Sequence, residues 1–177
     1  MEAADEQLML AYRDGDAGAF ETLYARHRTR LYRFVLRSVK SRPVGEELFQ
    51  EIWLRVIEAR ARYSPQARFT TWLYTIAHNH LVDHWRKRGL TLVALESDET
   101  PGTSPDPADQ AQARQSLERF AAALQALPPL QREAFLLHEE GEMSVAQIAA
   151  ATGTNEEAAK SRLRYAMAKL KAAMSDG

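Results

Sequence analysis

Cysteine is absent from the 177-residue chain, and its absence excludes disulfides, zinc-finger sites and thiolate chemistry. Any transition metal would have to be held by histidine and carboxylate side chains. Long hydrophobic runs are absent as well, because no stretch approaches the roughly 18 uncharged apolar residues of a membrane-spanning helix. The first residues, MEAADEQLML, are acidic where a signal peptide would be basic. We therefore expect a cytoplasmic protein with no membrane insertion.

Charge of one sign is missing from long stretches of the chain, although the formal net charge is only −1. Residues 26–42 contain seven basic residues and no acidic one, and residues 160–171 contain five basic residues and no acidic one. Residues 60–88 hold six Arg or Lys against the single acid Asp83. Such basic blocks are typical of surfaces that bind polyanions. Ordinary solvated helix faces are an equally good interpretation of charge alone.

Apolar residues recur at helical spacing in both halves of the chain. In the first half we expect helices near residues 20–37, 46–63 and 70–88, with a break around Pro43, packed as a three- or four-helix bundle. Residues 91–109 contain three prolines and five acids and no Lys or Arg, which predicts a flexible acidic linker. The sequence thus predicts an all-α protein of two small helical domains, with the first over residues 1–90, the linker over 91–111 and the second over 112–177.

The second half contains two helix starts in quick succession. Ser144 and Gln147 fit a capping box that begins a short helix, and Thr154 and Glu157 fit another that begins a longer one. Two helices joined by a tight turn that contains glycine predict a helix-turn-helix. A basic outward face on the longer helix favours DNA binding. The residues expected to face inward on that helix are Ala159, Leu163, Ala166, Met167 and Leu170.

The segment TIAHNHLVDHWRKRGL, residues 75–90, resembles two zinc signatures because three histidines and an aspartate lie within seven residues. At about 100° per residue, His78 and His80 would point roughly 160° apart on a helix, so they cannot share an ion. His80 and His84 do share a face, but it is the apolar face, and a third ligand would have to come from elsewhere. We therefore expect no metal and no cofactor, and we interpret His80 and His84 as residues of the core or its edge.

The opposite face of this predicted helix is polar and basic. Thr75, Asn79, Val82 and Arg86 follow helical spacing, so they form one strip, and His78 lies beside it. An amide with two hydrogen-bonding edges, followed by guanidinium groups, suits an unstacked base and the phosphates next to it. A plain solvated face remains the alternative for this helix taken alone.

Four segments, taken in order, resemble the extracytoplasmic-function (group IV) sigma factors of bacterial RNA polymerase over nearly the whole chain. FETLYARHRTRLYRFVLR, EELFQEIWLRVIEARARY and FTTWLYTIAHNHLVDHWRKR are similar to successive parts of sigma region 2. LPPLQREAFLLHEEGEMSVAQIAAATGTNEEAAKSRLRYAMAKLK is similar to region 4. The resemblance implies a factor without an active site that directs initiation at a restricted set of promoters. It also implies three partners, namely core RNA polymerase, promoter DNA and an anti-sigma factor.

The resemblance assigns roles to residues of both predicted domains. The second helix would dock on the clamp helices of the polymerase β′ subunit, and region 4 would contact the β flap. The core-binding set is Glu47, Leu48, Phe49, Gln50, Glu51, Trp53 and Arg55. The loop of residues 62–69 and Asn79 would capture a flipped-out base of the minus-ten element, and the minus-ten set is Arg62, Arg68, Thr75, His78, Asn79, Arg86, Lys87 and Arg88. The helix that follows the turn would read the minus-35 element, with the set Asn155, Lys160, Ser161, Arg162, Arg164 and Tyr165.

Two departures from the family pattern concern acidic residues. The family often has Asp-x-x-Asp before the QE of the core-binding helix, whereas this chain has Val44-Gly-Glu-Glu47, so only the second acid has an equivalent. The recognition helix begins with Glu156 and Glu157, which suit the helix dipole but repel phosphate. They are also able to accept from cytosine N4, which would change the minus-35 preference.

Three other classes of protein compete with this interpretation. A helix-turn-helix regulator would bind duplex DNA without core polymerase, but the first half shows no pattern for a ligand pocket or a phosphoacceptor. A histidine-based metallohydrolase is disfavoured by the helical geometry described above. A pure protein-interaction module would not need two basic faces.

Overall fold

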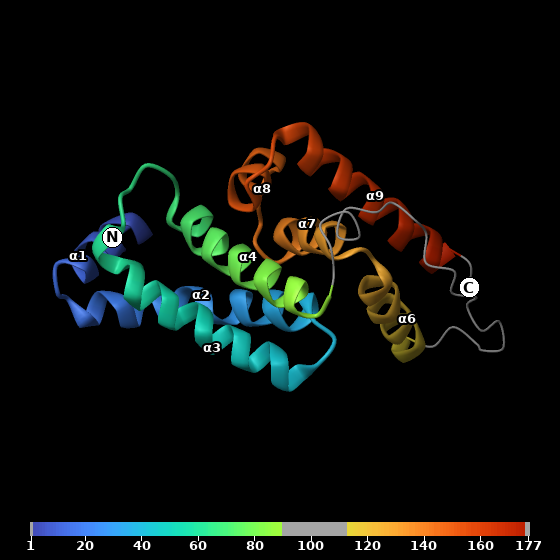
Figure 1. Ribbon diagram of the computed structural model, residues 1–177, viewed down its shortest axis with the longest axis horizontal. Helices are drawn as coiled ribbons and strands as arrows, with labels where there is room; N and C mark the ends of the chain where they lie inside the picture. The colour runs from blue at the N-terminus through green and yellow to red at the C-terminus, as the bar shows by residue number, and fades with distance from the viewer. Residues whose placement is uncertain (1, 90–112, 176–177) are drawn as a thin grey trace.

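The computed structural model describes residues 2–89 and 113–175, and within them every regular element is a helix (Figure 1). This confirms the predicted all-α class. The predicted linker lies outside the described residues. The elements, in chain order, are α1 (Asp5–Arg13), α2 (Ala17–Ser38), α3 (Arg42–Ala59), the 3-10 turn η1 (Arg60–Arg62), α4 (Phe69–Lys87), α6 (Ala113–Ala126), α7 (Pro129–Glu139), α8 (Val145–Thr152) and α9 (Glu156–Ser175).

The helices of the first half begin and end at local signals. The Asp16 side chain caps α2 by accepting from the Ala19 amide at 3.2 Å. The expected break at Pro43 is placed too late, because α3 begins at Arg42 and includes the proline in its first turn. Proline is tolerated there because the amide it lacks would have no partner within the helix. The interruption between α2 and α3 is therefore only the short segment around Val39 and Ser41.

The predicted helix-turn-helix is present as α8 and α9. Ser144 and Gln147 form the expected capping box, with the Gln147 amide donating to Ser144 Oγ at 3.2 Å. Gly153 ends α8 with a φ of 65°, a left-handed conformation that glycine adopts without steric cost. The second predicted box is wrong by one residue, because the Asn155 side chain accepts from the Ala158 amide at 2.7 Å and α9 begins at Glu156.

The buried core differs between the two halves in the kinds of side chain that it contains. In the first half, aromatic rings from α2, α3 and α4 meet edge to face, as Trp53 does with Phe20 at 5.9 Å and with Tyr24 at 5.0 Å between ring centroids. In the second half, small and aliphatic side chains from α8 and α9, such as Ile148 and Ala159, are fully buried. Most residues predicted to face inward on α9 are buried, but Met167 is 46% exposed, so its assignment to the core is wrong.

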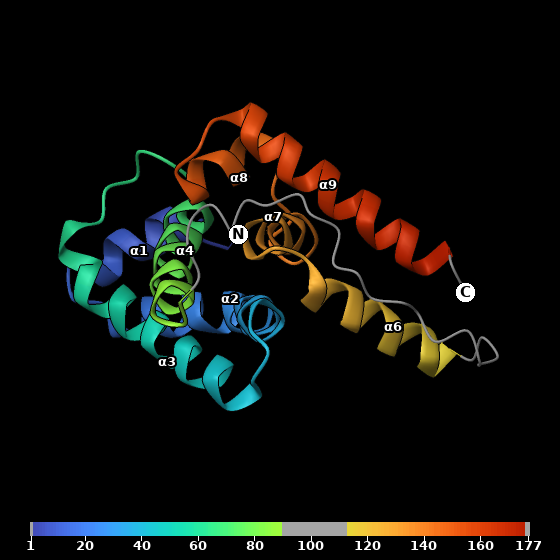
Figure 2. The same ribbon diagram turned by 45° about the vertical axis from the view of Figure 1, so that its right-hand side comes forward.

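The two halves pack against each other. Figures 1 and 2 show α7 next to α2 and α8 next to α4, and the same pairs of helices are in contact in the structure. α7 also packs on α9, so it lies between the first half and the recognition helix. α3 packs on α2 and α4 and leaves its outer face free of the second half.

Candidate nucleic-acid interface

The strip predicted on α4 is divided between solvent and the second half of the chain. Asn79 and Arg86 are exposed, whereas Val82 is only 9% exposed and Thr75 is half-buried. Thr75 Oγ1 donates to the Thr71 carbonyl of its own helix at 2.7 Å. The expectation that the whole strip faces solvent is therefore wrong for Val82, because residues distant in sequence cover it. Lys87 and Arg88 are exposed at the C-terminal end of α4.

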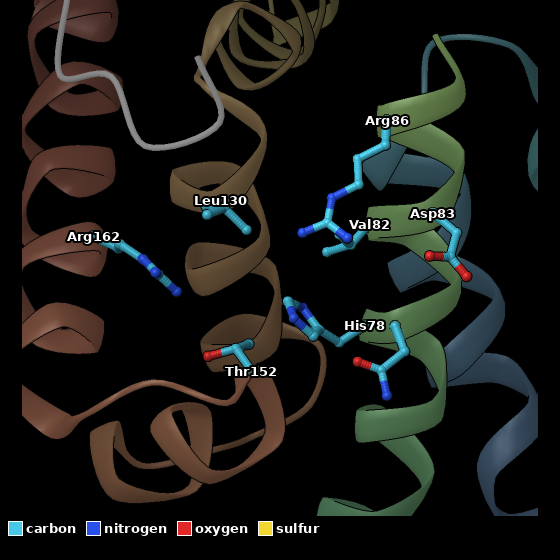
Figure 3. A pocket seen from close by; sticks show the side chains of 8 residues that line it. His78, Val82, Asp83, Arg86, Leu130, Thr152 and Arg162 are labelled. Atoms are coloured by element: carbon cyan, nitrogen blue, oxygen red, sulfur yellow. The ribbon is translucent and has the colours of Figure 1, made fainter. Parts of the chain in front are cut away.

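His78 points from α4 toward the second half (Figure 3). Its Nδ1 lies 2.9 Å and 2.8 Å from the two carboxylate oxygens of Glu133 on α7. The Glu133 side chain is completely buried, and the His78 side chain is 12% exposed. A ring N–H at Nδ1 is able to donate to either of these carboxylate oxygens. His78 thus holds the two halves together in this arrangement rather than standing free on the surface.

A cleft of about 330 Å³ separates α4 from the second half. Its α4 wall contains Asn79, and Figure 3 shows Arg86 reaching across from α4 while Asp83 turns away. Arg162, from the recognition helix, lines the opposite wall. The cleft therefore joins residues predicted to bind the minus-ten element with one predicted to bind the minus-35 element.

The histidines of α4 have separate partners. His80 is 9% exposed and its Nε2 bonds to Glu51 of α3, on the opposite side of α4 from the Glu133 contact of His78. Burial lowers the pKa of His84, and the neighbouring Arg88 guanidinium lowers it further. The positions of His80 and His84 confirm their assignment to the core and its edge. Among the described residues, no three His, Asp or Glu side chains gather as a metal site would require.

The loop that precedes α4 presents two of the predicted DNA contacts. Arg62 and Arg68 are both exposed, one at each end of the loop. Between them, Tyr63 is 2% exposed and packs edge to face on Trp72, with 5.1 Å between ring centroids. This buried tyrosine fixes the loop to α4 and leaves the two arginines on the surface.

Residues of α1 hold the base of this loop, and sequence analysis missed them. Arg13 Nη1 donates to the Tyr63 carbonyl at 3.2 Å, and the Arg60 guanidinium lies over the Tyr12 ring at 5.6 Å. The contact joins residues 50 positions apart, so no periodicity within one helix could reveal it. The amphipathic pattern of α1 was the available signal that this segment folds onto the bundle.

The recognition helix presents most of its predicted contacts to solvent. Lys160, Arg164 and Tyr165 are exposed, and the Arg164 guanidinium lies 5.3 Å from the centroid of the Tyr165 ring. Ser161 and Arg162 are half-buried. The Asn155 side chain is exposed, but its oxygen is used to cap α9. Lys160, Ser161 and Arg164 line a shallow cleft together with Glu156 and Glu157, so the acids lie directly beside the basic contacts.

The set predicted on α3 contains both surface and core residues. Glu47, Gln50 and Arg55 are exposed, and Phe49 and Glu51 are half-buried. Leu48 is 6% exposed and Trp53 is 5% exposed within the aromatic core. These two side chains pack beneath the helix and support it. The expectation that Trp53 lies beyond the apolar core is therefore wrong, and a contact of either residue with core polymerase stays a prediction. The exposed Leu54, which sequence analysis left out, adds an apolar side chain to that face.

Within the described residues, none of the helices combines the length and the apolar character that crossing a bilayer requires.

Two family models match the chain. The model described as Sigma-70 region 2 matches residues 23–91, and the model described as Sigma-70, region 4 matches residues 117–170. The first match contains the predicted core-binding helix and the α4 strip, and the second contains the helix-turn-helix. The two matches together include most of the described residues.

Curated relatives match over nearly the whole chain. The RNA polymerase sigma factor CarQ of Myxococcus xanthus is 38% identical over 166 residues, which cover 92% of this chain and 93% of the relative. The ECF RNA polymerase sigma factor RpoE of Cereibacter sphaeroides is 30% identical over 173 residues, which cover 95% of this chain and 93% of the relative.

Solved structures give the same result. The structure of CnrH in complex with the cytosolic domain of CnrY is similar with a TM-score of 0.74 and 25% identity, over 98% of each chain. The sigma factor RpoE of Bartonella quintana, crystallised with the anti-sigma factor NepR, shares the fold with a TM-score of 0.69 and 24% identity. That match covers 88% of this chain and 96% of the other.

Proposed function

We propose roles in promoter-directed transcription initiation for individual residues of this chain, which belongs to the extracytoplasmic-function RNA polymerase sigma factors of the sigma-70 family. The chain is a sigma factor. Its residues bind and position polymerase and DNA, and it contributes no catalytic chemistry of its own. The observation that carries the proposal is that α4, which is buried on one side, exposes both the Asn79 amide and the Arg86 guanidinium.

Core polymerase binds the outer face of α3 in this proposal. Glu47, Gln50 and Arg55 are exposed there, and Leu54 is 57% exposed among them. A mixed-charge rim around an apolar side chain is the usual composition of a protein interface. Leu48 and Trp53 keep the helix rigid from beneath. The clamp helices of the β′ subunit are the proposed partner of this face, and the β flap is that of region 4.

The minus-ten element binds α4 and the loop before it. Asn79 reads an unstacked base through its amide, and the loop between Arg62 and Arg68 closes around it. Arg86, Lys87 and Arg88 follow on the same helix and contact phosphates of the non-template strand. The minus-35 element binds α9 in its major groove, where Lys160 and Arg164 are exposed.

An anti-sigma factor is the proposed regulator. The solved structure of CnrH is a complex with the cytosolic domain of CnrY, and that of RpoE is a complex with the anti-sigma factor NepR. An inhibitor that covers α3 or the α4 strip would block the proposed contacts with polymerase and with the minus-ten element.

Run-off transcription tests the proposal. Purified chain and bacterial core polymerase are mixed with genomic fragments from the source organism, and the transcripts are sequenced. We expect discrete transcripts that require the chain and begin downstream of a shared pair of elements. The absence of both core binding and specific transcripts would refute the assignment. Duplex binding without core polymerase would instead support a helix-turn-helix regulator.

A further inference from the structure

The exposed side chains of α4 include an acid that the predicted strip leaves out. Within α4, the side chains fully exposed to solvent are Asn79, Asp83, Arg86 and Lys87. Asn79, Asp83 and Lys87 follow one another at four-residue spacing, so they form one row along the helix, which we call the open row. Figure 3 shows Asp83 turned away from the cleft into which Arg86 reaches. A carboxylate thus lies one turn from the amide proposed to read a base.

The contacts of the fold do not explain this acid. Arg86 and Lys87 lie three and four residues after Asp83, at the spacings at which acids and bases pair on helices. Among the described residues, however, the Asp83 carboxylate forms no ion pair or hydrogen bond. Arg42 and Glu46 do pair across one turn of α3, with 3.2 Å between Arg42 Nε and Glu46 Oε1. Asp83 also lies one turn before the end of α4, where the helix dipole favours basic side chains over acids.

The acid also opposes the charge around it. Asp83 is the single acid among residues 60–88, which contain six Arg or Lys. An exposed carboxylate on a surface proposed to bind phosphates weakens that binding by repulsion. A neutral residue at position 83 would therefore bind the DNA backbone more tightly. An acid here is useful for a ligand group that donates hydrogen bonds.

Bases of an unstacked strand come within reach of Asp83 when Asn79 holds one of them. Four residues of an α-helix span about 6 Å along its axis. Stacked neighbours in one DNA strand are about 3.4 Å apart along the strand. A base within two nucleotides of the one at Asn79 is therefore level with the Asp83 carboxylate.

Guanine is the base whose donors match a carboxylate best. A carboxylate only accepts hydrogen bonds, through its two oxygens. An unstacked base presents its Watson–Crick edge, and on guanine this edge has two adjacent donors, N1–H and N2–H. Cytosine and adenine have one amino donor beside an acceptor nitrogen, and thymine has one N–H between two carbonyl oxygens. Guanine therefore satisfies both carboxylate oxygens at once, through charge-assisted bonds.

We propose that Asp83 is a specificity-determining residue for the minus-ten element. Its carboxylate accepts from N1–H and N2–H of an unstacked guanine that lies within two nucleotides of the base held by Asn79. This inference rests on the proposed function, because it requires the non-template strand to lie along α4. Asp83 favours strands that carry the guanine, and its repulsion of phosphates disfavours strands that lack it.

Binding of altered oligonucleotides to the holoenzyme tests this role. The probe is a labelled non-template oligonucleotide with the minus-ten element of a promoter identified by run-off transcription, and each position of the element is changed to all four bases. We expect one position at which the wild type prefers guanine about tenfold, and no such preference with Asp83→Asn. Hypoxanthine at that position removes only the N2 amino group. It should weaken wild-type binding about fivefold and leave binding by the variant unchanged.

The matched control is Glu21→Gln, which removes the same charge from an exposed position of α2 outside the proposed contacts. This variant should keep the guanine preference and its sensitivity to hypoxanthine. Asp83→Asn should bind oligonucleotides without the guanine about twofold more tightly than the wild type does, because a charge that repels phosphates is gone. A purely electrostatic role would instead raise the binding of all oligonucleotides alike, which would contradict base reading by Asp83.

Three further outcomes would overturn the inference while the proposed function stands. The first is an Asp83→Asn variant with wild-type preferences at every position, in a chain that directs specific transcription. The second is the loss of a preference for a base other than guanine. The third is weaker core binding by the folded variant, which would assign the carboxylate to the polymerase interface. If the wild-type chain starts no specific transcript with core polymerase, it is the proposed function that fails.

Discussion

The two helices proposed to bind DNA, α4 and α9, differ in how much of their basic faces is exposed. α4 rests on a core of aromatic rings, and one side of its strip is covered by the second half of the chain. α9 rests on small and aliphatic side chains, and its basic face is exposed, with Lys160 and Arg164 free of covering helices. The basic face of α9 is therefore open to solvent in this arrangement, whereas α4 exposes only part of its strip, with Asn79 and Arg86 exposed and Val82 covered.

The largest expected effect is on the aromatic support of α4. Trp53→Ala leaves a cavity among Phe20, Tyr24 and Phe49, and we expect it to lower the free energy of unfolding by about 3–5 kcal/mol. Thermal or urea unfolding monitored by circular dichroism measures the change. Gln50→Ala, at an exposed position of the same helix, is the control and should alter stability by less than about 0.5 kcal/mol. A mild effect of Trp53→Ala would mean that this residue is a surface contact after all.

Asn79→Ala tests strand reading by α4. Losing an amide that reads a base should cost about 1–3 kcal/mol, which corresponds to a roughly ten- to hundredfold loss of promoter opening. Fluorescence of 2-aminopurine in the minus-ten element reports the opening, and core binding is measured in parallel. The exposed side chain makes a folding defect unexpected, so core binding should be retained. Normal promoter opening by this variant would show that the α4 strip does not read the minus-ten element.

Lys160→Ala tests duplex reading by α9 and should have a smaller effect. The exposed ammonium stabilises the complex with DNA through its charge, so its loss should weaken binding of the minus-35 duplex. The slope of log K against log salt concentration should become less steep by about one unit. Fluorescence anisotropy at several salt concentrations gives both quantities. Binding of a DNA that carries a preformed minus-ten bubble should not change. If the bubble is affected as strongly as the duplex, the division of labour between α4 and α9 is incorrect.

Arg13→Ala should have the smallest effect and tests the support of the loop before α4. The lost hydrogen bond to the Tyr63 carbonyl corresponds to about 0.5–1.5 kcal/mol. We expect a modest drop in thermal stability and a weaker preference for the minus-ten sequence, measured by competition between matched and mismatched bubbles. The control is Arg33→Ala, which removes the same charge from an exposed position of α2 and should leave both the thermal stability and the sequence preference unchanged. Equal effects of the two variants would show that charge alone matters.

Helical periodicity predicted the local structure well and the tertiary contacts poorly. It placed His80 and His84 on the inner face of α4, because side chains four residues apart must share a face. It could not predict that Glu133 would cover His78, since that contact depends on how two separate bundles pack. Trp53 and Met167 were assigned to the wrong environments because each lies at the edge of an apolar stripe. The cap of α9 was placed one residue early, because Thr154 and Asn155 are both good capping residues.

The most direct test of the central claim is run-off transcription by core polymerase on one identified promoter, with the wild-type chain and with Asn79→Ala. The account predicts a strong, chain-dependent transcript with the wild type, and a transcript reduced about ten- to hundredfold with the variant despite unchanged core binding. A wild-type chain that binds core polymerase but starts no specific transcript, or a variant that transcribes as well as the wild type, would contradict it.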